Sequence, residues 1–364
     1  MHRTLAAAIV ACSLFGGGER APAQVERRAA NIVDASLVRL EARALPLERI
    51  LEQIELQTGN RIVDERPGGD AARSDMAKVE AGERPFWPLL DDLAARTGAT
   101  LNFRGRDRAV RLSGGGPSRA PVAYRGLFRF SLDRVLLTQD FRGADSTRSC
   151  VLELSVQAEP KARIVEMRLV GDAVAAWDDQ GAELGRLGPQ SAYVGWERDA
   201  LEANVPLRIE CPSRSASELK RVEGRFDVVL AAGAERFVFD RTTGLRDVAV
   251  RRPGLTATLL SFDEQDEGMW VARIKVERPA DAVFLDSFQR SALAPDVRAT
   301  TPSGQSRPPT GGMNSTDLGR GAMQFEYFFV GLPGEIAEYA LEATAPAELS
   351  RIEVPFAFES IPLP

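Results

Sequence analysis

The residue types able to support acid–base, nucleophilic or metal chemistry are scarce in this chain. The only histidine among its 364 residues is His2, in an N-terminal segment that we expect to be removed on export. The mature chain would then lack Ser-His-Asp and Cys-His catalysis and every histidine-dependent metal site. The sequence also contains no phosphate-binding P-loop and no GxGxxG fingerprint after a predicted strand. We therefore expect a non-enzymatic protein without catalytic residues, cofactor or metal.

Carboxylates are the remaining source of chemistry, and they gather at two predicted turns. Asp178, Asp179 and Glu183 surround one turn, and residues 263–267 form an acidic run at another. Several carboxylate oxygens suit Ca²⁺. Neither segment has the spacing of an EF-hand loop, so a solvated hairpin tip is the simpler interpretation. Two carboxylates would also suffice for glycoside hydrolysis, which makes a carboxylate-based hydrolase the third functional hypothesis.

Two cysteines, Cys150 and Cys211, remain once the N-terminal segment is removed. An exported chain meets an oxidising compartment, where a disulfide between them would close a long loop and stabilise the fold by about 4 kcal/mol. Buried free thiols that pack as small apolar residues are the alternative, because the sequence does not fix the distance between the two Cβ atoms. We treat the pair as a candidate disulfide.

Three tryptophans, Trp87, Trp177 and Trp196, are candidates for recognition of a partner or ligand. Exposed tryptophans on β-sandwiches stack on sugars or anchor protein partners. Trp87 lies off the Phe86–Leu93 stripe of a predicted helix, so we expect its indole to be exposed. Burial in a core is the competing interpretation for each tryptophan.

An internal repeat at residues 40–59 and 79–98 defines the first elements that would position these side chains. A shift of 39 residues aligns the two segments without a gap. The identical pairs are Glu41/Glu80, Ala42/Ala81, Pro46/Pro85, Leu51/Leu90, Thr58/Thr97 and Gly59/Gly98. In each copy an apolar stripe at helical spacing begins after the proline and ends at the glycine, between two short strands. The repeat therefore predicts two βαβ units.

These two signatures resemble the short N-terminal domain of secretins and TonB-dependent receptors, called the STN domain, over residues 36–113. The residues that carry the resemblance are Pro46, Leu47, Leu51, Ile54, Thr58 and Gly59, then Pro85, Phe86, Leu90, Leu93, Thr97 and Gly98. The resemblance implies a periplasmic location and contacts with other proteins. The chain departs from that family in lacking a membrane pore and in an insertion at residues 66–76, which we expect to be a surface loop.

The remainder of the chain has the pattern of β structure. Residues 114–123 have the composition of a linker. Short alternating runs separated by turns then predict two immunoglobulin-like sandwiches, at 124–245 and 246–364, similar to generic domains of exported bacterial proteins; one larger sandwich is the alternative. Residues 300–321, rich in Pro, Gly, Ser and Thr, are expected to form a disordered loop. The predicted fold class is thus an α+β N-terminal domain of two βαβ repeats followed by a mainly-β region.

Residues 1–23 have the layout of a secretory signal peptide. A short polar start precedes an apolar run, residues 5–15, that is too short to span a bilayer, and small residues lie before a cut that would expose Gln24. A lipoprotein anchored through Cys12 is the alternative. No later segment is long and apolar enough to cross a membrane, and the net charge of −6 disfavours a nucleic-acid partner.

These features together favour an exported, periplasmic or extracellular protein. We expect it to bind other envelope proteins through unpaired edges of its sheets, because such an edge can accept a strand from a partner. A carbohydrate- or cell-wall-binding module is the alternative, which would require two or more exposed, coplanar aromatic side chains.

Overall fold

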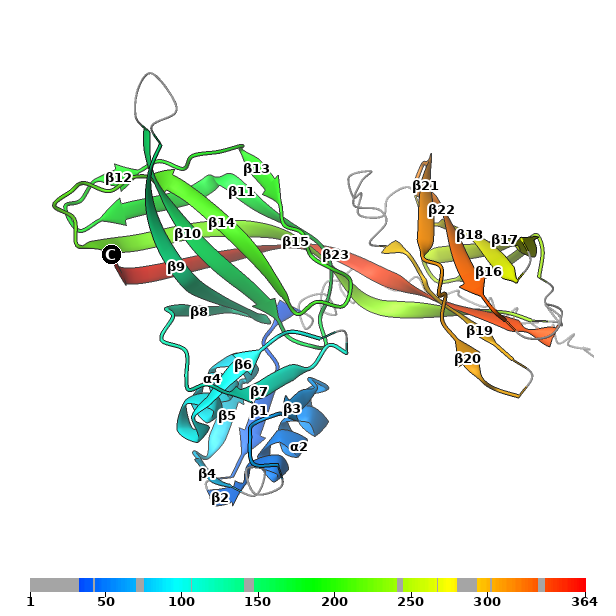
Figure 1. Cartoon of the computed structure of the whole chain (residues 1–364), viewed down its shortest axis with the longest axis horizontal. Helices are drawn as coiled ribbons and strands as arrows, with labels where there is room; N and C mark the ends of the chain where they lie inside the picture. The colour runs from blue at the N-terminus through cyan, green and yellow to red at the C-terminus, as the bar shows by residue number, and fades with distance from the viewer. Residues whose placement is uncertain are drawn as a thin grey trace, which may run out of the picture.

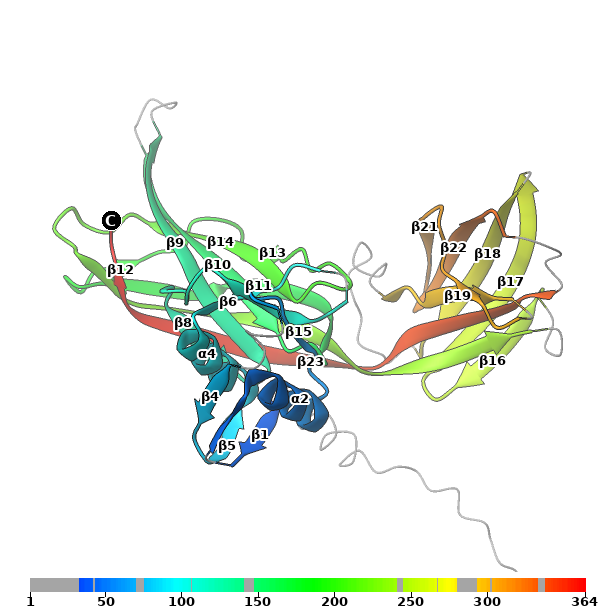
Figure 2. The ribbon, with the colours of Figure 1, turned by 60° about the horizontal axis from the view of Figure 1, so that its bottom comes forward.

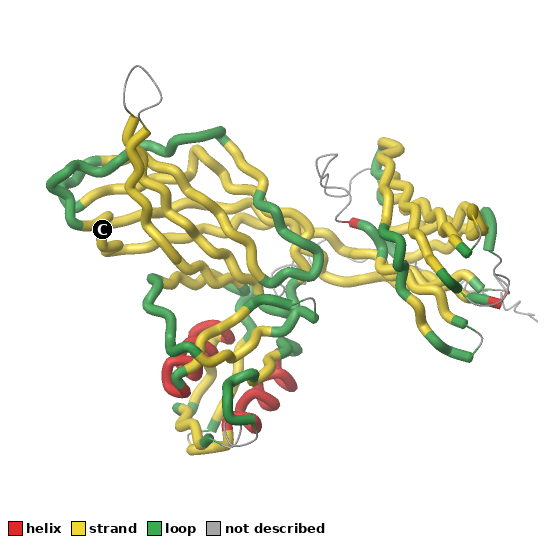
Figure 3. The backbone as a smooth tube through the Cα atoms, viewed as in Figure 1, coloured by secondary structure: helices red, strands yellow, loops and turns green. Residues whose placement is uncertain are grey.

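The computed structural model is mainly β and describes residues 33–41, 43–69, 75–105, 107–140, 147–240, 245–266, 268–279, 293–301, 303–332 and 338–364. Its two described α-helices both belong to a small N-terminal unit, residues 33–114, and the named elements outside this unit are all strands (Figures 1 and 3). The strands form two lobes joined by a long ribbon (Figure 1). Neither described helix is long and apolar enough to cross a membrane.

The N-terminal unit contains helices α2 (Leu47–Thr58) and α4 (Phe86–Thr97). Its strands are β1 (Leu37–Leu40), β2 (Arg43–Pro46), β3 (Ile62–Asp64), β4 (Met76–Val79), β5 (Gly82–Pro85), β6 (Ala99–Asn102) and β7 (Val110–Gly114). Strand β1 pairs with β5, β2 pairs with β4, and β3, β7 and β6 form a three-stranded sheet in that order. One apolar core contains residues from both helices and all three sheets.

The 39-residue repeat also relates the strand pairs to each other. Leu37 lies opposite Pro85 in one pair, and the shifted positions, Met76 and Pro46, lie opposite each other in the second pair. The first strand of each copy therefore pairs with the second strand of the other copy, in the same register. The two halves exchange equivalent strands, so neither half is complete alone.

The helices end in the same way because the repeat conserves the residues that end them. Gly59 and Gly98 both adopt left-handed backbone, with φ of 72° and 64°, which glycine adopts without a Cβ clash. Thr58 and Thr97 each donate a side-chain hydrogen bond, at 2.7 and 2.8 Å, to the carbonyl four residues earlier. The helix boundaries predicted from sequence are confirmed at these positions.

The first lobe is built from two facing sheets that share one apolar core. One sheet has the order β14-β10-β9-β8, and in the first lobe the other consists of β12, β11, β15 and β23 with β13 beside β11. Their bounds are β8 (Val122–Arg125), β9 (Phe128–Asp140), β10 (Thr147–Ala158), β11 (Arg163–Asp178), β12 (Glu183–Leu184), β13 (Ser191–Tyr193), β14 (Glu202–Glu210), β15 (Glu218–Phe239) and β23 (Ala340–Pro362). Phe130 from the first sheet stacks on Phe226 from the second, with ring centroids 5.9 Å apart.

The second lobe has its own apolar core. Its five-stranded sheet has the order β16-β17-β18-β22-β21, and β19 and β20 extend the sheet of β23. The bounds are β16 (Val248–Arg252), β17 (Leu255–Asp266), β18 (Met269–Glu277), β19 (Asp296–Thr300), β20 (Ser306–Arg307), β21 (Met313–Gly319) and β22 (Ala322–Val330). The hairpin predicted across the acidic run is confirmed by the antiparallel pairing of β17 with β18.

A ribbon of two long strands, β15 and β23, runs through both lobes (Figures 1 and 2). Its pairing extends from Glu218 opposite Pro362 in the first lobe to Phe239 opposite Leu341 in the second. The structure thus differs from the expected division at residue 245, because the C-terminal half of β23 belongs to the first lobe. Residues 300–321, which were expected to form a disordered loop, instead contain β21, and this strand pairs with β22.

Candidate binding cleft

A polar face on the first lobe is the structural basis of the candidate site. Along β9, Phe128, Phe130 and Leu132 enter the apolar core. Because neighbouring side chains of a strand alternate between faces, Arg129 and Ser131 lie on the opposite face. Both side chains are nevertheless buried. Buried polar side chains on the outer face of a sheet imply a cover that supplies hydrogen bonds.

Four residues on four neighbouring strands form one polar row across this face. Tyr124 on β8 lies opposite Arg129, which lies opposite Gln157 on β10, which lies opposite Glu202 on β14. Arg129 Nη1 donates to Gln157 Oε1 at 3.0 Å, and Gln157 Nε2 donates to Glu202 Oε1 at 2.8 Å. Arg129, Gln157 and Glu202 therefore form a continuous hydrogen-bonded chain along the row.

Helix α4 covers one end of this row, where it lies against β8 and β9 (Figure 2). Asp91 on α4 accepts hydrogen bonds from Arg129 Nε at 2.8 Å and Arg129 Nη2 at 3.1 Å, a bidentate pair. The Tyr124 hydroxyl donates to the same carboxylate at 2.7 Å. Burial and the Asp91 carboxylate both raise the pKa of the Tyr124 phenol, so it remains a donor. Asp91 thereby fixes α4 to the polar face.

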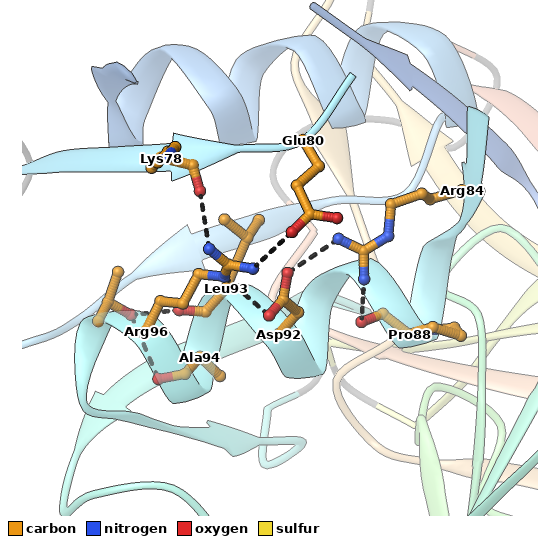
Figure 4. Close-up of polar contacts among 9 residues, drawn as sticks. Lys78, Glu80, Arg84, Pro88, Asp92, Leu93, Ala94 and Arg96 are labelled. Carbon is orange, nitrogen blue, oxygen red and sulfur yellow. Dashed lines mark hydrogen bonds and ion pairs between the residues drawn. The ribbon is translucent and has the colours of Figure 1, made fainter. Parts of the chain in front are cut away.

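The residue after Asp91 holds the helix to its own unit (Figure 4). Asp92 accepts a hydrogen bond from Arg84 Nη1 and another from Arg96 Nε, both at 2.8 Å. Burial raises the pKa of Asp92, but these two arginines act in the opposite direction and hold it below its ordinary value. Arg96 also lies 3.5 Å from Glu80. Two consecutive aspartates therefore join α4 to both the first lobe and the N-terminal unit.

A second polar row borders the first. Ser131 on β9 lies opposite Ser155 on β10, and Ser155 lies opposite Asn204 on β14. The Ser155 hydroxyl is hydrogen-bonded to the Asp133 carboxylate and lies 2.8 Å from the side-chain amide oxygen of Asn204. Because Asp133 is exposed, this row presents a carboxylate to solvent.

A cleft of about 590 Å³ opens between this polar face and the N-terminal unit. Its walls include Tyr124, Asp133 and Glu202 on the lobe, and residues 99–104 on the opposite side. Strand β6 (Ala99–Asn102) is an edge strand of the described three-stranded sheet. An unpaired edge can hydrogen-bond an extended segment through its backbone, while neighbouring side chains select the sequence. The cleft therefore combines an edge strand with polar side chains.

A second network fixes the N-terminal unit that forms this wall. Glu159, in the turn after β10, is fully buried. It accepts hydrogen bonds from Ser36 N at 2.8 Å, from Ser36 Oγ, and from Asn60 Nδ2 at 2.8 Å. Lys161 Nζ lies 3.7 Å from the same carboxylate. A buried carboxylate with this set of donors positions the unit on the first lobe.

The three candidate tryptophans lie outside the described lining of the cleft. Trp87 is 1 % exposed and donates from Nε1 to the Leu127 carbonyl at 3.0 Å. The Trp87 indole is thus buried and not exposed as expected, because the first lobe covers the side of α4 on which it lies. Trp177 and Trp196 are half-buried, and Trp196 packs against the core of the first lobe.

The two candidate disulfide cysteines lie on neighbouring strands. Cys150 on β10 lies opposite Ile209, and Cys211 follows two residues later, just beyond the end of β14. Both are free thiols in the structure. Burial, with a smaller contribution from Cys211, raises the pKa of the Cys150 thiol to about 12. The disulfide stays a prediction, and the diagonal placement brings the two side chains to one face of the sheet.

The acidic turn at Asp178 has a structural explanation. Asp178 is fully buried, and its Oδ1 accepts hydrogen bonds from Gln180 N at 3.0 Å and Ala182 N at 2.9 Å. Hydrogen bonds from Ser217 lower the pKa of Asp179.

Within the described residues no group of three or more His, Cys, Asp or Glu side chains is placed to hold a metal ion.

Sequence reasoning missed the polar face, although a signal for it exists. Alternation along Phe128–Asp133 and Leu152–Gln157 assigns the polar residues to one face of the sheet. It cannot show that this face is covered, because the covering helix comes from a distant part of the chain.

No protein-family model matches this chain, and no curated protein matches it. The functional argument therefore depends on the geometry of the cleft and on the chemistry of its side chains.

Proposed function

We propose that the protein is an exported, non-catalytic protein of the cell envelope that binds another protein in the cleft. In this proposal residues 36–113 form an STN-like α+β domain, and the two lobes are immunoglobulin-like sandwiches. The observation that carries the proposal is the position of β6, an edge strand on one wall of a polar cleft of about 590 Å³. A partner segment in extended conformation would pair with β6 and place side chains against the polar rows.

The charges of the cleft favour a basic segment in the partner. The Asp91 carboxylate is matched by Arg129. Asp133 and Glu202 instead receive hydrogen bonds from the neutral side chains of Ser155 and Gln157. One further cation, the exposed Arg104, lines the cleft, so these two carboxylates leave it acidic and would attract a lysine or arginine of the partner.

Site-specific photo-cross-linking in the native envelope fraction tests this proposal. A photoreactive residue at Arg104, which is exposed and lines the cleft, should give a discrete protein adduct. The same residue at Leu56, which is 87 % exposed on α2, serves as the control and should not. Asp133→Lys should abolish the adduct at Arg104, whereas the same charge change at exposed Glu48 should leave it unchanged. Equal adducts at both positions, or an adduct insensitive to Asp133→Lys, would contradict the proposal.

A glycan is the second candidate ligand, because Tyr124 is 42 % exposed and lines the same cleft. An aromatic ring beside carboxylates can stack on a sugar and accept its hydroxyl hydrogen bonds. Calorimetric titration with cell-wall fragments distinguishes the two ligands: binding that Tyr124→Ala removes would favour the glycan. Release of new reducing ends during the titration would instead indicate a carboxylate-based hydrolase and contradict the non-catalytic assignment.

A further inference from the structure

Four arginines from three parts of the molecule meet where the β15–β23 ribbon passes between the lobes. We call Arg108, Arg163, Arg198 and Arg278 the waist cluster. Arg108 follows β6 in the N-terminal unit, Arg163 begins β11, Arg198 lies in the segment before β14, and Arg278 follows β18.

Contacts with backbone carbonyls locate three of the guanidinium groups at this waist, and strand pairing locates the backbone of the fourth arginine there. Arg108 Nη2 donates to the carbonyl of Ala162, the residue before Arg163. Arg278 Nη2 donates to the Pro346 carbonyl on the ribbon at 2.7 Å. Arg198 Nη1 donates to the carbonyl of Pro295 at 3.4 Å. Arg163 itself lies opposite Ala231 of the ribbon.

The waist cluster has more hydrogen-bond donors than acceptors. Among the described residues, none of its four arginines forms an ion pair with a carboxylate. Arg108 Nε and Arg163 Nη2 are buried and have no hydrogen-bond partner. Buried donors without partners cost free energy, and charged ones cost the most. All four residues are only partly buried, so part of each remains accessible to solvent.

The charges of the waist cluster repel each other. Burial lowers the pKa of Arg163 to about 10, with further lowering by Arg198 and Arg108. Burial and the charge of Arg163 likewise lower the pKa of Arg278 to about 10. Asp199 and Asp296 are the carboxylates that act on Arg163 in the opposite direction. Neither carboxylate lies in an ion pair with an arginine of the waist cluster among the described residues.

We propose that the waist cluster binds an oxyanion with the chemistry of a phosphate group. A guanidinium presents parallel N–H groups that match two phosphate oxygens, and several arginines can share one such anion. The anion would supply the negative charge and the hydrogen-bond acceptors that the cluster lacks. Because its ligands come from the N-terminal unit and both lobes, its binding would hold the three parts together. This inference is independent of the proposed function.

Titration of the full chain with inorganic phosphate at constant ionic strength, followed by ³¹P NMR and calorimetry, tests the inference. Wild-type protein should bind phosphate, and Arg163→Met should weaken binding at least about 10-fold, which corresponds to losing one charged hydrogen bond. The control is Arg251→Met, at an exposed position on β16, which should leave the dissociation constant unchanged. Absence of binding by the wild type, or equal weakening in the two variants, would overturn the inference.

The thermal stability of the same variants gives a second readout. Without phosphate, Arg163→Met should melt at a higher temperature than wild type, because an unmatched charge is replaced by an apolar side chain of similar length. With saturating phosphate the order should reverse, because only the wild type gains binding energy. An unchanged order in phosphate would also overturn the inference. Arg278→Met replaces Arg163→Met if the latter does not fold.

Glycerol 3-phosphate identifies the source of the phosphate group. Equal affinity for this monoester and for inorganic phosphate would support recognition of a phosphate carried by a larger molecule. Binding of inorganic phosphate alone would support a free structural ion.

Discussion

Replacement of Glu159 tests how the N-terminal unit is held on the first lobe. Glu159 is fully buried and accepts hydrogen bonds from Ser36 N and Asn60 Nδ2, each at 2.8 Å, and from Ser36 Oγ. Glu159→Ala leaves these donors without an acceptor. A buried donor that loses its partner costs about 1–3 kcal/mol. We therefore expect Glu159→Ala to destabilise the protein by about 4 kcal/mol.

The isosteric Glu159→Gln variant separates hydrogen bonding from packing. The glutamine retains one acceptor oxygen, but its NH₂ group must face the donors of Ser36 or Asn60. We expect a loss of about 2 kcal/mol, near half that of the alanine variant. The control is Glu48→Ala, at an exposed position in the first turn of α2, where the change should stay within about 0.5 kcal/mol.

Urea unfolding followed by far-UV circular dichroism measures these changes, and limited proteolysis shows which part is released. Glu159→Ala should expose the segment between the N-terminal unit and the first lobe, so that protease releases the unit at a lower urea concentration than in wild type. A loss below about 1 kcal/mol for Glu159→Ala, or release of the second lobe first, would refute the reasoning. Loss of the cross-link at Arg104 in this variant would connect the docking to the cleft.

Three further predictions concern the other polar contacts. Arg129→Met and Asp91→Asn should each destabilise the protein by about 2–4 kcal/mol, and the double variant should lose less than the sum, as a double-mutant cycle with urea unfolding will show. Because the pKa of Asp92 is lowered in the folded protein, its ionised carboxylate stabilises the fold above the unfolded-state pKa. This stabilisation is lost as pH falls through the lower, folded-state pKa. Asp92→Asn should therefore flatten the decline of the unfolding free energy below about pH 4. An unchanged acid limb would contradict that assignment. The intact mass of protein from the envelope fraction should be about two daltons light if Cys150 and Cys211 are bridged, and should correspond to a chain cleaved after the predicted signal peptide. A lipid-modified or uncleaved mass would contradict soluble export.

The N-terminal unit shows how far a repeat can be used for prediction. Proline before and glycine after each apolar stripe predict the two helices, and the structure has them at Leu47–Thr58 and Phe86–Thr97. The exchange of strands between the copies was not predicted. Local pattern defines a strand but does not name its partner, because pairing depends on contacts that are distant in sequence.

The β15–β23 ribbon shows what the alternation of apolar and polar residues does not predict. Each strand changes lobe midway, and the alternation along β15 breaks at residues 228–231, where four consecutive apolar residues are buried. Val222 and Phe226 pack in the core of the first lobe, whereas Phe237 and Phe239 pack in that of the second. Val222 and Phe226 are separated by odd numbers of positions from Phe237 and Phe239, and the ribbon keeps one pairing register, so the two lobes pack on opposite faces of the ribbon. Alternation assigns residues to a face, but it contains no information about which sheet that face meets. A sequence division into consecutive domains therefore separates residues that the ribbon joins.

The break in alternation within β9 was a usable signal for the cleft. Asp133 and Arg134 are consecutive charged residues in an otherwise alternating strand, and the pairing register shifts there, between Glu153 and Leu154 of β10. A bulge places two adjacent residues on one face of the sheet, and both Asp133 and Arg134 are exposed. An uninterrupted strand would direct Arg134 into the core, so the bulge is needed to keep both charges outside it. It also marks where the polar face ceases to be covered and the Asp133 carboxylate becomes available to a partner.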